Sequence, residues 1–436
     1  MSLYPPRPGV VCRMRGHALV AMFGLCLLAA SAGTAAAQPA AAPGPGPRVE
    51  WVRGYGGWLT EEHPHAAVQA GDGGFVIVGE TTGESGSRIF VVRTDEHGRE
   101  LFARSYGAGR YHLGNFVLEE ADGSLLVAGS WDVGSTSIQE DRVLLRLAPD
   151  GEVLDMRAYP GPRRDAIEGL ALNADGTMVA VGYRDADQDE LNSFIVDTGR
   201  AFVMKLDQDL GVLWERAIRG AMFQAFGVQP RTDAPGYAVF GACRGSGEHT
   251  RFCISFTDED GNAGLPIIYG TRTSHPYDFD AAHGGGFILT GHVSDCPDGC
   301  WDGFLVRVDA TGRELWSVSF GEPNGGTPDR MFEECYGVRS VPGGGYVTAC
   351  GSGVEPGNEA RPGDLLNIWR AYVVRVTEDG AIQWQASYGS PHANNAAEFV
   401  LPTRDGGYAV FADSDEHGAG EGANIALYKL AGDPPR

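Results

Sequence analysis

The sequence predicts an all-β protein, and three observations lead to that prediction. The chain of 436 residues holds 64 glycines and 25 prolines beside 43% apolar residues, which suits many short strands joined by turns. Short apolar runs alternate with Asp-Gly and Gly-Gly dipeptides, and these are strong signals for β-hairpins. The pattern of runs and turns recurs at intervals of roughly 50 to 60 residues, as expected of a repeat architecture.

The repeating unit is clearest at residues 67–107, where the pattern indicates four short strands. The first strand ends in the turn Asp72–Gly74, the second spans Phe75–Gly79, the third spans Ile89–Arg93 and the fourth ends at Gly107. Later repeats carry the turn at Asp122, Asp175, Pro235, Gly284, Gly343 and Asp405. A glycine closes the second strand in all repeats but the last: Gly79, Gly129, Gly182, Gly241, Gly291 and Gly351, with Ala412 in the seventh.

The two ends of the chain complete one repeat between them. The seventh repeat stops after its third strand, Leu427–Leu430, and the missing fourth strand matches Val49–Gly56. Pairing of the two ends would leave no open sheet edge, whereas an open solenoid would need capping repeats. The sequence therefore predicts a seven-bladed β-propeller of four-stranded blades over residues 49–431, its ring closed by the N-terminal strand.

Residues 1–37 have the layout of a cleavable export signal. Arg15 precedes an apolar run, Ala18–Ala30, and Ala35–Ala37 resembles a signal-peptidase site. The ordinary layout begins at Met14, which is an alternative start. The apolar run is too short for a comfortable membrane span, and no other segment is long enough, so no span is expected. We expect a periplasmic, secreted or cell-surface protein.

The remaining segments outside the repeats are short. Residues 38–48, rich in Pro, Ala and Gly, are expected to form a flexible leader, and residues 432–436 a short tail. Removal of the export signal takes away three arginines and no acidic residue, which changes the formal charge from -23 to -26. Such an acidic surface disfavours nucleic acid and anionic lipid as partners, and favours cations, basic partners or uncharged ligands. Solubility alone would also explain it.

Six cysteines remain after cleavage. An even number in an exported chain favours disulfides, although six cysteines allow fifteen pairings. The repeat register places neighbouring cysteines within one blade and predicts the pairs Cys243–Cys253, Cys296–Cys300 and Cys335–Cys350. Zinc is the alternative, but Pro, Asp and Gly between Cys296 and Cys300 make a poor zinc motif.

The two faces of the predicted disc differ in their loops. The tight turns share one face, and the longer, more polar connections share the other, which we call the long-loop face. Binding residues tend to lie on variable loops held by a rigid scaffold, so this face is the candidate functional surface. Alignment of the innermost strands predicts a ring at the channel mouth formed by His65, Asn115, Glu168, Gly227, Tyr277, Tyr336 and Glu398, with His63 and His275 one step further out.

These ring residues have chemistry that suits a ligand. Imidazoles, carboxylates and phenols that converge on one pore could hold a metal or hydrogen-bond a small polar ligand. A water-filled channel lined by polar groups is the alternative. A one-residue slip in the alignment would turn alternate side chains away from the channel.

The sequence offers one weak candidate for a calcium site. Asp185, Asp187 and Asp189 place carboxylates at alternate positions of a loop. The loop is not an EF-hand, because Glu190 and Val196 stand where that motif needs glycine and glutamate. An acidic, solvated loop is the alternative interpretation.

The repeats resemble a known group. Asp309–Trp316, with the sequence DATGRELW, is similar to the tryptophan-docking motif of pyrroloquinoline-quinone propellers. The unit as a whole resembles the DGG-[YF]-x-V-x-G repeats of secreted bacterial β-propellers, which are similar to quinoprotein-like propeller repeats. The resemblance covers nearly all of 49–430 and implies the fold. It does not imply dehydrogenase activity, because the quinone dehydrogenases are larger and this chain has no adjacent Cys-Cys pair.

No catalytic motif stands out in the chain. It has no G-x-S-x-G elbow, HExxH motif, phosphate-binding loop or dinucleotide fingerprint. The sequence favours a monomeric, non-enzymatic module that binds a polypeptide or a cell-surface saccharide on its long-loop face. A polysaccharide hydrolase or lyase with its site in the ring is the first alternative, and a calcium-stabilised structural protein is the second. No cofactor is firmly implied, although calcium is possible.

Overall fold

The computed structural model describes residues 44–107, 111–134, 139–187, 194–294, 301–321, 332–353, 368–418 and 422–434. In these ranges the regular structure consists of β-strands and one 3-10 turn, η2 (Ser246–Glu248). No helix in the described part of the chain is long and apolar enough to cross a membrane. The all-β prediction is confirmed.

The strands form antiparallel sheets that follow chain order. Four sheets contain four consecutive strands each: β2 (Glu61–Gln69), β3 (Phe75–Gly83), β4 (Gly86–Thr94) and β5 (Glu100–Tyr106); β6 (His112–Glu119), β7 (Leu125–Asp132), β8 (Glu140–Leu147) and β9 (Val153–Tyr159); β10 (Arg164–Leu172), β11 (Met178–Ala186), β12 (Arg200–Leu206) and β13 (Val212–Ala217); and β14 (Met222–Pro230), β15 (Tyr237–Arg244), β16 (Thr250–Thr257) and β17 (Ile267–Tyr269).

The later strands form two further sheets. One contains β18 (Ser274–Ala281), β19 (Phe287–Ser294), β20 (Trp301–Val308), β21 (Glu314–Phe320), β22 (Phe332–Ser340), β23 (Tyr346–Gly353), β24 (Arg370–Val376) and β25 (Ile382–Tyr388). A single parallel pair, Trp301 with Phe332, joins its two four-stranded halves. The other contains β26 (Asn395–Pro402), β27 (Tyr408–Ser414), β28 (Asn424–Leu430) and β1 (Val49–Tyr55).

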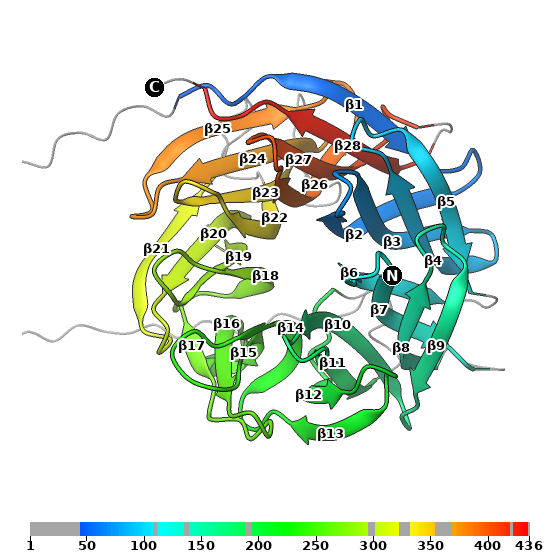
Figure 1. The fold of residues 1–436 in the computed structure, drawn as a ribbon. Helices are drawn as coiled ribbons and strands as arrows, with labels where there is room; N and C mark the ends of the chain where they lie inside the picture. Colours follow the sequence, from blue (N-terminus) through cyan, green and yellow to red (C-terminus); the bar gives the residue numbers. More distant parts are fainter. Residues whose placement is uncertain are drawn as a thin grey trace, which may run out of the picture. The chain divides into compact units, whose positions relative to one another are not determined.

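The sheets stand side by side around a common centre (Figure 1). The strands nearest to that centre are β2, β6, β10, β14, β18, β22 and β26. β1, the first strand of the chain, pairs antiparallel with β28, the last, from Val49 opposite Leu430 to Tyr55 opposite Ile425. This is the pairing expected from the incomplete first and last repeats.

The core lies between neighbouring sheets. Val76, Ile77 and Val78 of β3 are fully buried, and so are Val91 and Val92 of β4. Middle strands are covered on both faces by the adjacent sheets, and for that reason they are continuous apolar runs without a polar alternation. Each fully buried side chain of this size contributes about 1.5–3 kcal/mol relative to an exposed one.

A tyrosine at the end of the outermost strand links successive sheets. The hydroxyl of Tyr55 donates to the carbonyl of Gly98 at 2.6 Å, and that of Tyr106 donates to the carbonyl of Gly151 at 2.7 Å. Tyr159 and Tyr269 repeat this contact with the carbonyls of Leu210 and Gly312. Each acceptor lies in the turn between the third and fourth strands of the next sheet. These tyrosines therefore hold neighbouring sheets together.

The described end of the leader differs from the expectation of a flexible spacer. The amide of Gly44 donates to the carbonyl of Gln383 at 3.0 Å, and Tyr388 donates to the carbonyl of Pro47 at 2.9 Å. The last sheet has no third-to-fourth turn within it, because its outermost strand comes from the N-terminus. Residues 44–48 take the place of that turn as the acceptor for Tyr388. Residues 1–43 lie outside the described ranges.

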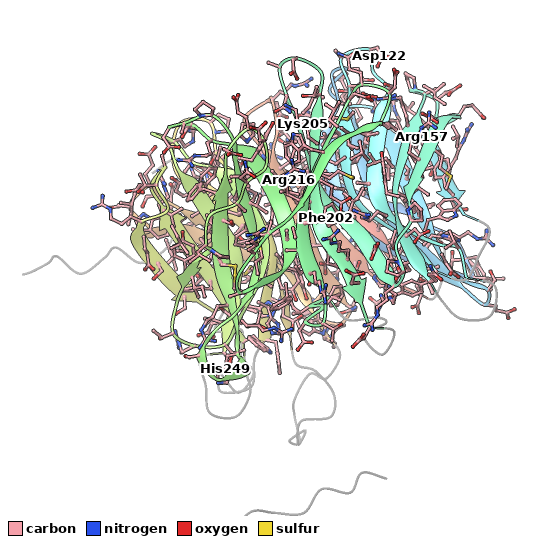
Figure 2. All side chains as sticks on the ribbon, turned by 90° about the horizontal axis from the view of Figure 1, so that it is seen from below. Asp122, Arg157, Phe202, Lys205, Arg216 and His249 are labelled. Atoms are coloured by element: carbon pink, nitrogen blue, oxygen red, sulfur yellow. A yellow bond between two sulfur atoms is a disulfide. The ribbon has the colours of Figure 1, made fainter. Side chains whose placement is uncertain are left out.

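The two kinds of connection lie on opposite faces. In Figure 2, Asp122, in the turn from β6 to β7, lies at the upper rim, and His249, in the connection from β15 to β16, lies at the lower rim. The face on the side of His249 carries the second-to-third and fourth-to-first connections. It corresponds to the long-loop face of the sequence analysis.

Two of the three expected disulfides are confirmed. Cys243 on β15 is bonded to Cys253 on β16, and Cys335 on β22 is bonded to Cys350 on β23. All four residues are fully buried. In the chain-entropy view, each bond is worth roughly 2–3 kcal/mol for loops of this length. The third pair, Cys296 and Cys300, lies outside the described residues.

Candidate functional site

A cavity of about 360 Å³ lies between the innermost strands. Every innermost strand contributes to its wall, and Tyr111, Phe194 and Val196 from long-loop connections complete it. The cavity therefore lies at the long-loop end of the channel. All positions of the sequence-predicted ring line it: His65, Asn115, Glu168, Gly227, Tyr277, Tyr336 and Glu398.

A β-bulge on each innermost strand directs these side chains. The register of β2 against β3 shifts between Pro64 and Ala66, so His65 is the extra residue. Such a bulge interrupts the ladder and re-aims a side chain. The same kind of shift occurs on every innermost strand, and the extra residues are His65, Asn115, Glu168, Phe226, Tyr277, Tyr336 and Glu398.

The closing glycine of the repeat accommodates this bulge. A Cβ atom at Gly79 would lie 1.8 Å from the carbonyl oxygen of His63, and one at Gly129 would lie 1.8 Å from that of Leu113. Only glycine permits such a close approach of the innermost backbone. Similar contacts occur at Gly182, Gly241 and Gly291, whereas Gly351 lies against Trp369 and Ala396. The closing glycine was thus a sequence signal for the bulge, and hence for the ring.

One ring position differs from the sequence alignment. The extra residue of β14 is Phe226, not Gly227. Gly227 also borders the cavity, but a Cβ atom there would lie 2.7 Å from the ring of Phe279. The alignment was one residue out of register at this bulge, and it therefore missed the aromatic side chain of Phe226.

Two carboxyl groups in the cavity have no cationic partner among the described residues. Glu168 accepts a hydrogen bond from Gln224 Nε2 at 3.4 Å. Burial raises the pKa of Glu168 to about 7, although the hydrogen bond from Gln224 by itself lowers this pKa. Burial also raises the pKa of Glu398 well above its ordinary value, and the nearby carboxylates of Asp413 and Glu334 raise it further. Both carboxyls therefore favour the protonated form until a positive charge approaches.

We expect Glu168→Gln to stabilise the protein at pH 8 and to leave its stability at pH 4 nearly unchanged. The pKa of Glu168 is 4.5 ordinarily and about 7 in the fold. Its contribution to stability is present in full below pH 4.5 and is lost as the pH rises through 7. At about 1.4 kcal/mol per pH unit, the loss is roughly 3 kcal/mol. Glutamine does not ionise, so the variant does not lose this stability as the pH rises, and its side-chain carbonyl can still accept a hydrogen bond from Gln224. Urea unfolding at both pH values measures the difference, and an equal change at pH 4 would contradict it.

The arginines of the cavity are already paired. Arg164 Nε donates to Glu140 Oε2 at 2.5 Å, and both side chains are almost fully buried. Arg339 forms an ion pair with Asp278, and its guanidinium lies 4.4 Å from the centre of the Phe399 ring. These positive charges are therefore compensated within the wall.

One side of the cavity is an aromatic wall formed by Phe194, Phe226, Tyr277 and Tyr336. The ring centroids of Tyr277 and Tyr336 are 4.6 Å apart, and those of Phe226 and Tyr277 are 5.7 Å apart. Phe194, which is 66% exposed, contacts both tyrosine rings at 6.2–6.5 Å. The hydroxyl of Tyr336 donates to Glu334 Oε2 at 2.6 Å. Burial raises the pKa of both tyrosines well above 10, so they remain neutral.

His65 and Asn115 are held by the backbone of the next sheet. His65 Nδ1 lies 2.9 Å from the carbonyl oxygen of Gly114. A carbonyl only accepts, so Nδ1 carries the hydrogen and Nε2 is the ring's other binding atom. Asn115 Nδ2 donates to the carbonyl of Ile167 at 3.1 Å. These bonds fix both side chains at the cavity wall.

His63 and His275, the outer members of the predicted ring, do not line the cavity. His63 Nδ1 lies 2.8 Å from Asp413 Oδ2. Burial opposes the charge on His63, but the carboxylate of Asp413 prevails and raises its pKa to about 9. His275 Nδ1 lies 3.2 Å from His292 Nε2. Each histidine is therefore engaged in its own local pair.

The candidate calcium loop is only partly described. Asp187 forms an ion pair with Arg163, and Asp185 Oδ2 lies 4.0 Å from Arg200. Asp189 lies outside the described residues. Within the described ranges, no group of three or more His, Cys, Asp or Glu residues is arranged to hold a metal ion. A calcium site at this loop stays a prediction.

Comparisons with known proteins bear on the fold alone. No protein-family model matches the sequence, and no curated protein does. Among solved structures, the WD40 domain of Pan2 from Neurospora crassa is 10% identical, with 86% of this chain and 90% of that chain covered and a TM-score of 0.50. Puromycin hydrolase is 14% identical, with 80% and 50% covered and a TM-score of 0.49. The sheets and the Pan2 match together identify a β-propeller.

Proposed function

We propose that this chain is an exported, non-enzymatic β-propeller with seven four-stranded blades, and that it binds a polypeptide or a cell-surface saccharide on its long-loop face. The runs of four strands around one centre and the pairing of β1 with β28 support seven blades and a closed ring. Two buried disulfides are compatible with an oxidising compartment.

The observation that carries the binding function is the central cavity with its aromatic wall. Ligand sites are typically concave, with aromatic surface and a few fixed polar groups, and a cavity of about 360 Å³ is within their usual size. Trp58 and Leu59, in the connection from β1 to β2, are 68% and 86% exposed on the same face. Exposed aromatic and apolar side chains beside a pocket are typical of recognition surfaces.

Binding arrays test the proposal directly. The mature chain from Gln38 is applied to glycan and peptide arrays, and its ligand is measured again with the variant Trp58→Ala/Phe194→Ala. We expect at least a tenfold loss of affinity. A matched control, Leu154→Ala/Leu213→Ala, removes exposed side chains from the outer strands β9 and β13 and should bind normally. An equal loss in the control would contradict a site on the long-loop face.

An enzyme that acts on a polysaccharide is the second candidate, and one observation favours it. Glu168, whose pKa is about 7, shares the cavity with the half-buried carboxyl of Glu398. A carboxyl that stays protonated near neutral pH can act as a general acid beside a second carboxylate. Release of new reducing ends or unsaturated sugars from polysaccharides, abolished by Glu168→Gln, would establish this function in place of simple binding.

A calcium-stabilised structural protein is the third candidate. Its test is the melting temperature with chelator and then with added calcium. A rise of several degrees that Asp185→Asn/Asp187→Asn abolishes would place calcium at the end of β11. An unchanged melting temperature would remove this candidate.

A further inference from the structure

The charges around the central cavity do not balance. Arg164 and Arg339 are each bonded to a carboxylate of their own, so neither offers a free positive charge to a ligand. Glu168 and Glu398 line the same cavity, and no cationic side chain among the described residues pairs with them. A ligand with a positive charge would be their first counter-ion.

The aromatic wall suits the same kind of ligand. Phe194, Phe226, Tyr277 and Tyr336 form one continuous series of ring contacts along the cavity. A cation within about 6 Å of an aromatic ring is attracted by it, and more strongly where water is excluded. Quaternary ammonium groups are typically recognised by several aromatic rings around one cation. The wall and the two carboxyls line the same cavity.

We propose that the central cavity binds an organic ammonium group, held between the aromatic wall and the carboxylates of Glu168 and Glu398. The proposal rests on the binding function of the long-loop face and names the chemistry of its ligand. An anion would meet two acidic groups without an available cation, and a neutral ligand would leave both carboxyls protonated and make no use of their charge.

The affinity for an ammonium group should depend on pH. A positive charge favours the ionised form of both carboxyls, so binding releases protons that burial keeps on them. Affinity therefore rises with pH across the neutral range. The titratable groups next to these two carboxyls are Glu140 and Tyr183 at Glu168, and Tyr277, Glu334, Tyr336 and Asp413 at Glu398. The other titratable and charged groups of the same cavity wall are His65, Glu80, Tyr111, Arg164, Asp278 and Arg339.

Choline is a suitable probe because its charge does not titrate. Its neutral isostere, 3,3-dimethyl-1-butanol, has the same shape without the charge. Calorimetric titration of the mature protein should give one choline site, with affinity at least tenfold above that for the alcohol. Between pH 6 and 8 the choline affinity should rise by up to about tenfold per pH unit for each proton released.

Variants assign the effect to named side chains. Glu168→Gln/Glu398→Gln should weaken choline binding at pH 8 at least tenfold and flatten its pH dependence. We expect glutamine to raise the stability of the fold at this pH, so the loss would not come from unfolding. Tyr277→Ala should weaken binding at least tenfold, whereas Tyr277→Phe, which keeps the ring, should weaken it less than threefold.

Two further ligands distinguish the sources of the ammonium group. A short peptide with one lysine between glycines is compared with butylamine. Tighter binding of the peptide would indicate a basic side chain of a polypeptide partner. Equal or tighter binding of butylamine would indicate a small free amine. Either result supports an ammonium site.

Three results would overturn the proposal: choline that binds no better than the alcohol, a double glutamine variant that binds choline like the wild type, or an equal loss in Tyr277→Phe and Tyr277→Ala. Persistent binding to the arrays would then show that only the ligand chemistry is wrong. Loss of both kinds of binding would also reject the binding function of the long-loop face.

Discussion

Replacement of Arg164 by methionine is expected to destabilise the protein by about 3–5 kcal/mol at pH 7, because it leaves a buried carboxylate without its counter-ion. Glu140 is fully buried, and Arg164 is its ionic partner. The only other described side-chain bond to Glu140 is from Ser130 Oγ, at 2.6 Å. Urea unfolding of Arg164→Met against the wild type measures the change.

A matched double variant separates the lost charge pair from lost packing. In Arg164→Met/Glu140→Gln the buried group is neutral and can still accept from Ser130. We expect it to recover at least half of the loss, since replacing both members of a buried pair is far less costly than removing one. The loss in the single variant should also shrink at low pH, where Glu140 becomes protonated. A single variant within about 1 kcal/mol of the wild type would contradict this account.

Replacement of Trp384 by alanine is expected to cost about 3–5 kcal/mol, the usual range for a buried tryptophan. Trp384 is 1% exposed, and its ring lies 5.7 Å from that of Tyr408. Its Nε1 donates to Asp433 Oδ1 at 2.9 Å, so the short C-terminal tail is also part of the packing. Gly46, from the N-terminal segment, lies against the same ring. Trp384 therefore joins both described chain ends to β25. Thermal and urea unfolding measure the effect.

The equivalent tryptophan of an earlier repeat is the control. Trp214 occupies the same place on β13 but is only partly buried. Trp214→Ala should therefore cost less, about 1–2 kcal/mol. Asp433→Ala removes the acceptor that the indole N–H shares with the Tyr408 hydroxyl, together with an ion pair to Arg375, and should cost about 1–3 kcal/mol. If Trp214→Ala were as costly as Trp384→Ala, the contacts of Trp384 with the two chain ends would add nothing to the stability of the fold.

Much of this fold could be predicted from the sequence because single residues at fixed places in the repeat determine the local backbone geometry. Asp-Gly turns marked the hairpins, and the incomplete end repeats predicted the pairing of β1 with β28. The register also placed Cys335 opposite Cys350, which are directly paired on β22 and β23. Such features are local or periodic, so they can be recognised in the sequence without knowledge of the tertiary packing.

The lining of the cavity could be predicted in part. The ring positions were found from alignment, and six of the seven bulged residues agree with it. Phe226 was missed because side chains alternate along a strand, and one bulged residue shifts the alternation. Phe194 was missed because it lies in a loop, where no periodicity in the sequence indicates which way a side chain points.

The sequence by itself thus determined the strands, the turns and the closing glycines, since each is a local requirement of backbone geometry. Only the tertiary structure decided the chemistry of the cavity. The partner of Arg164 is 24 residues away, and that of Arg339 is 61 residues away. Which charges are neutralised and which carboxyls remain for a ligand depends on contacts between strands of different four-stranded units. Those contacts follow from the packing of the sheets around one centre, and the order of residues along a strand does not specify them.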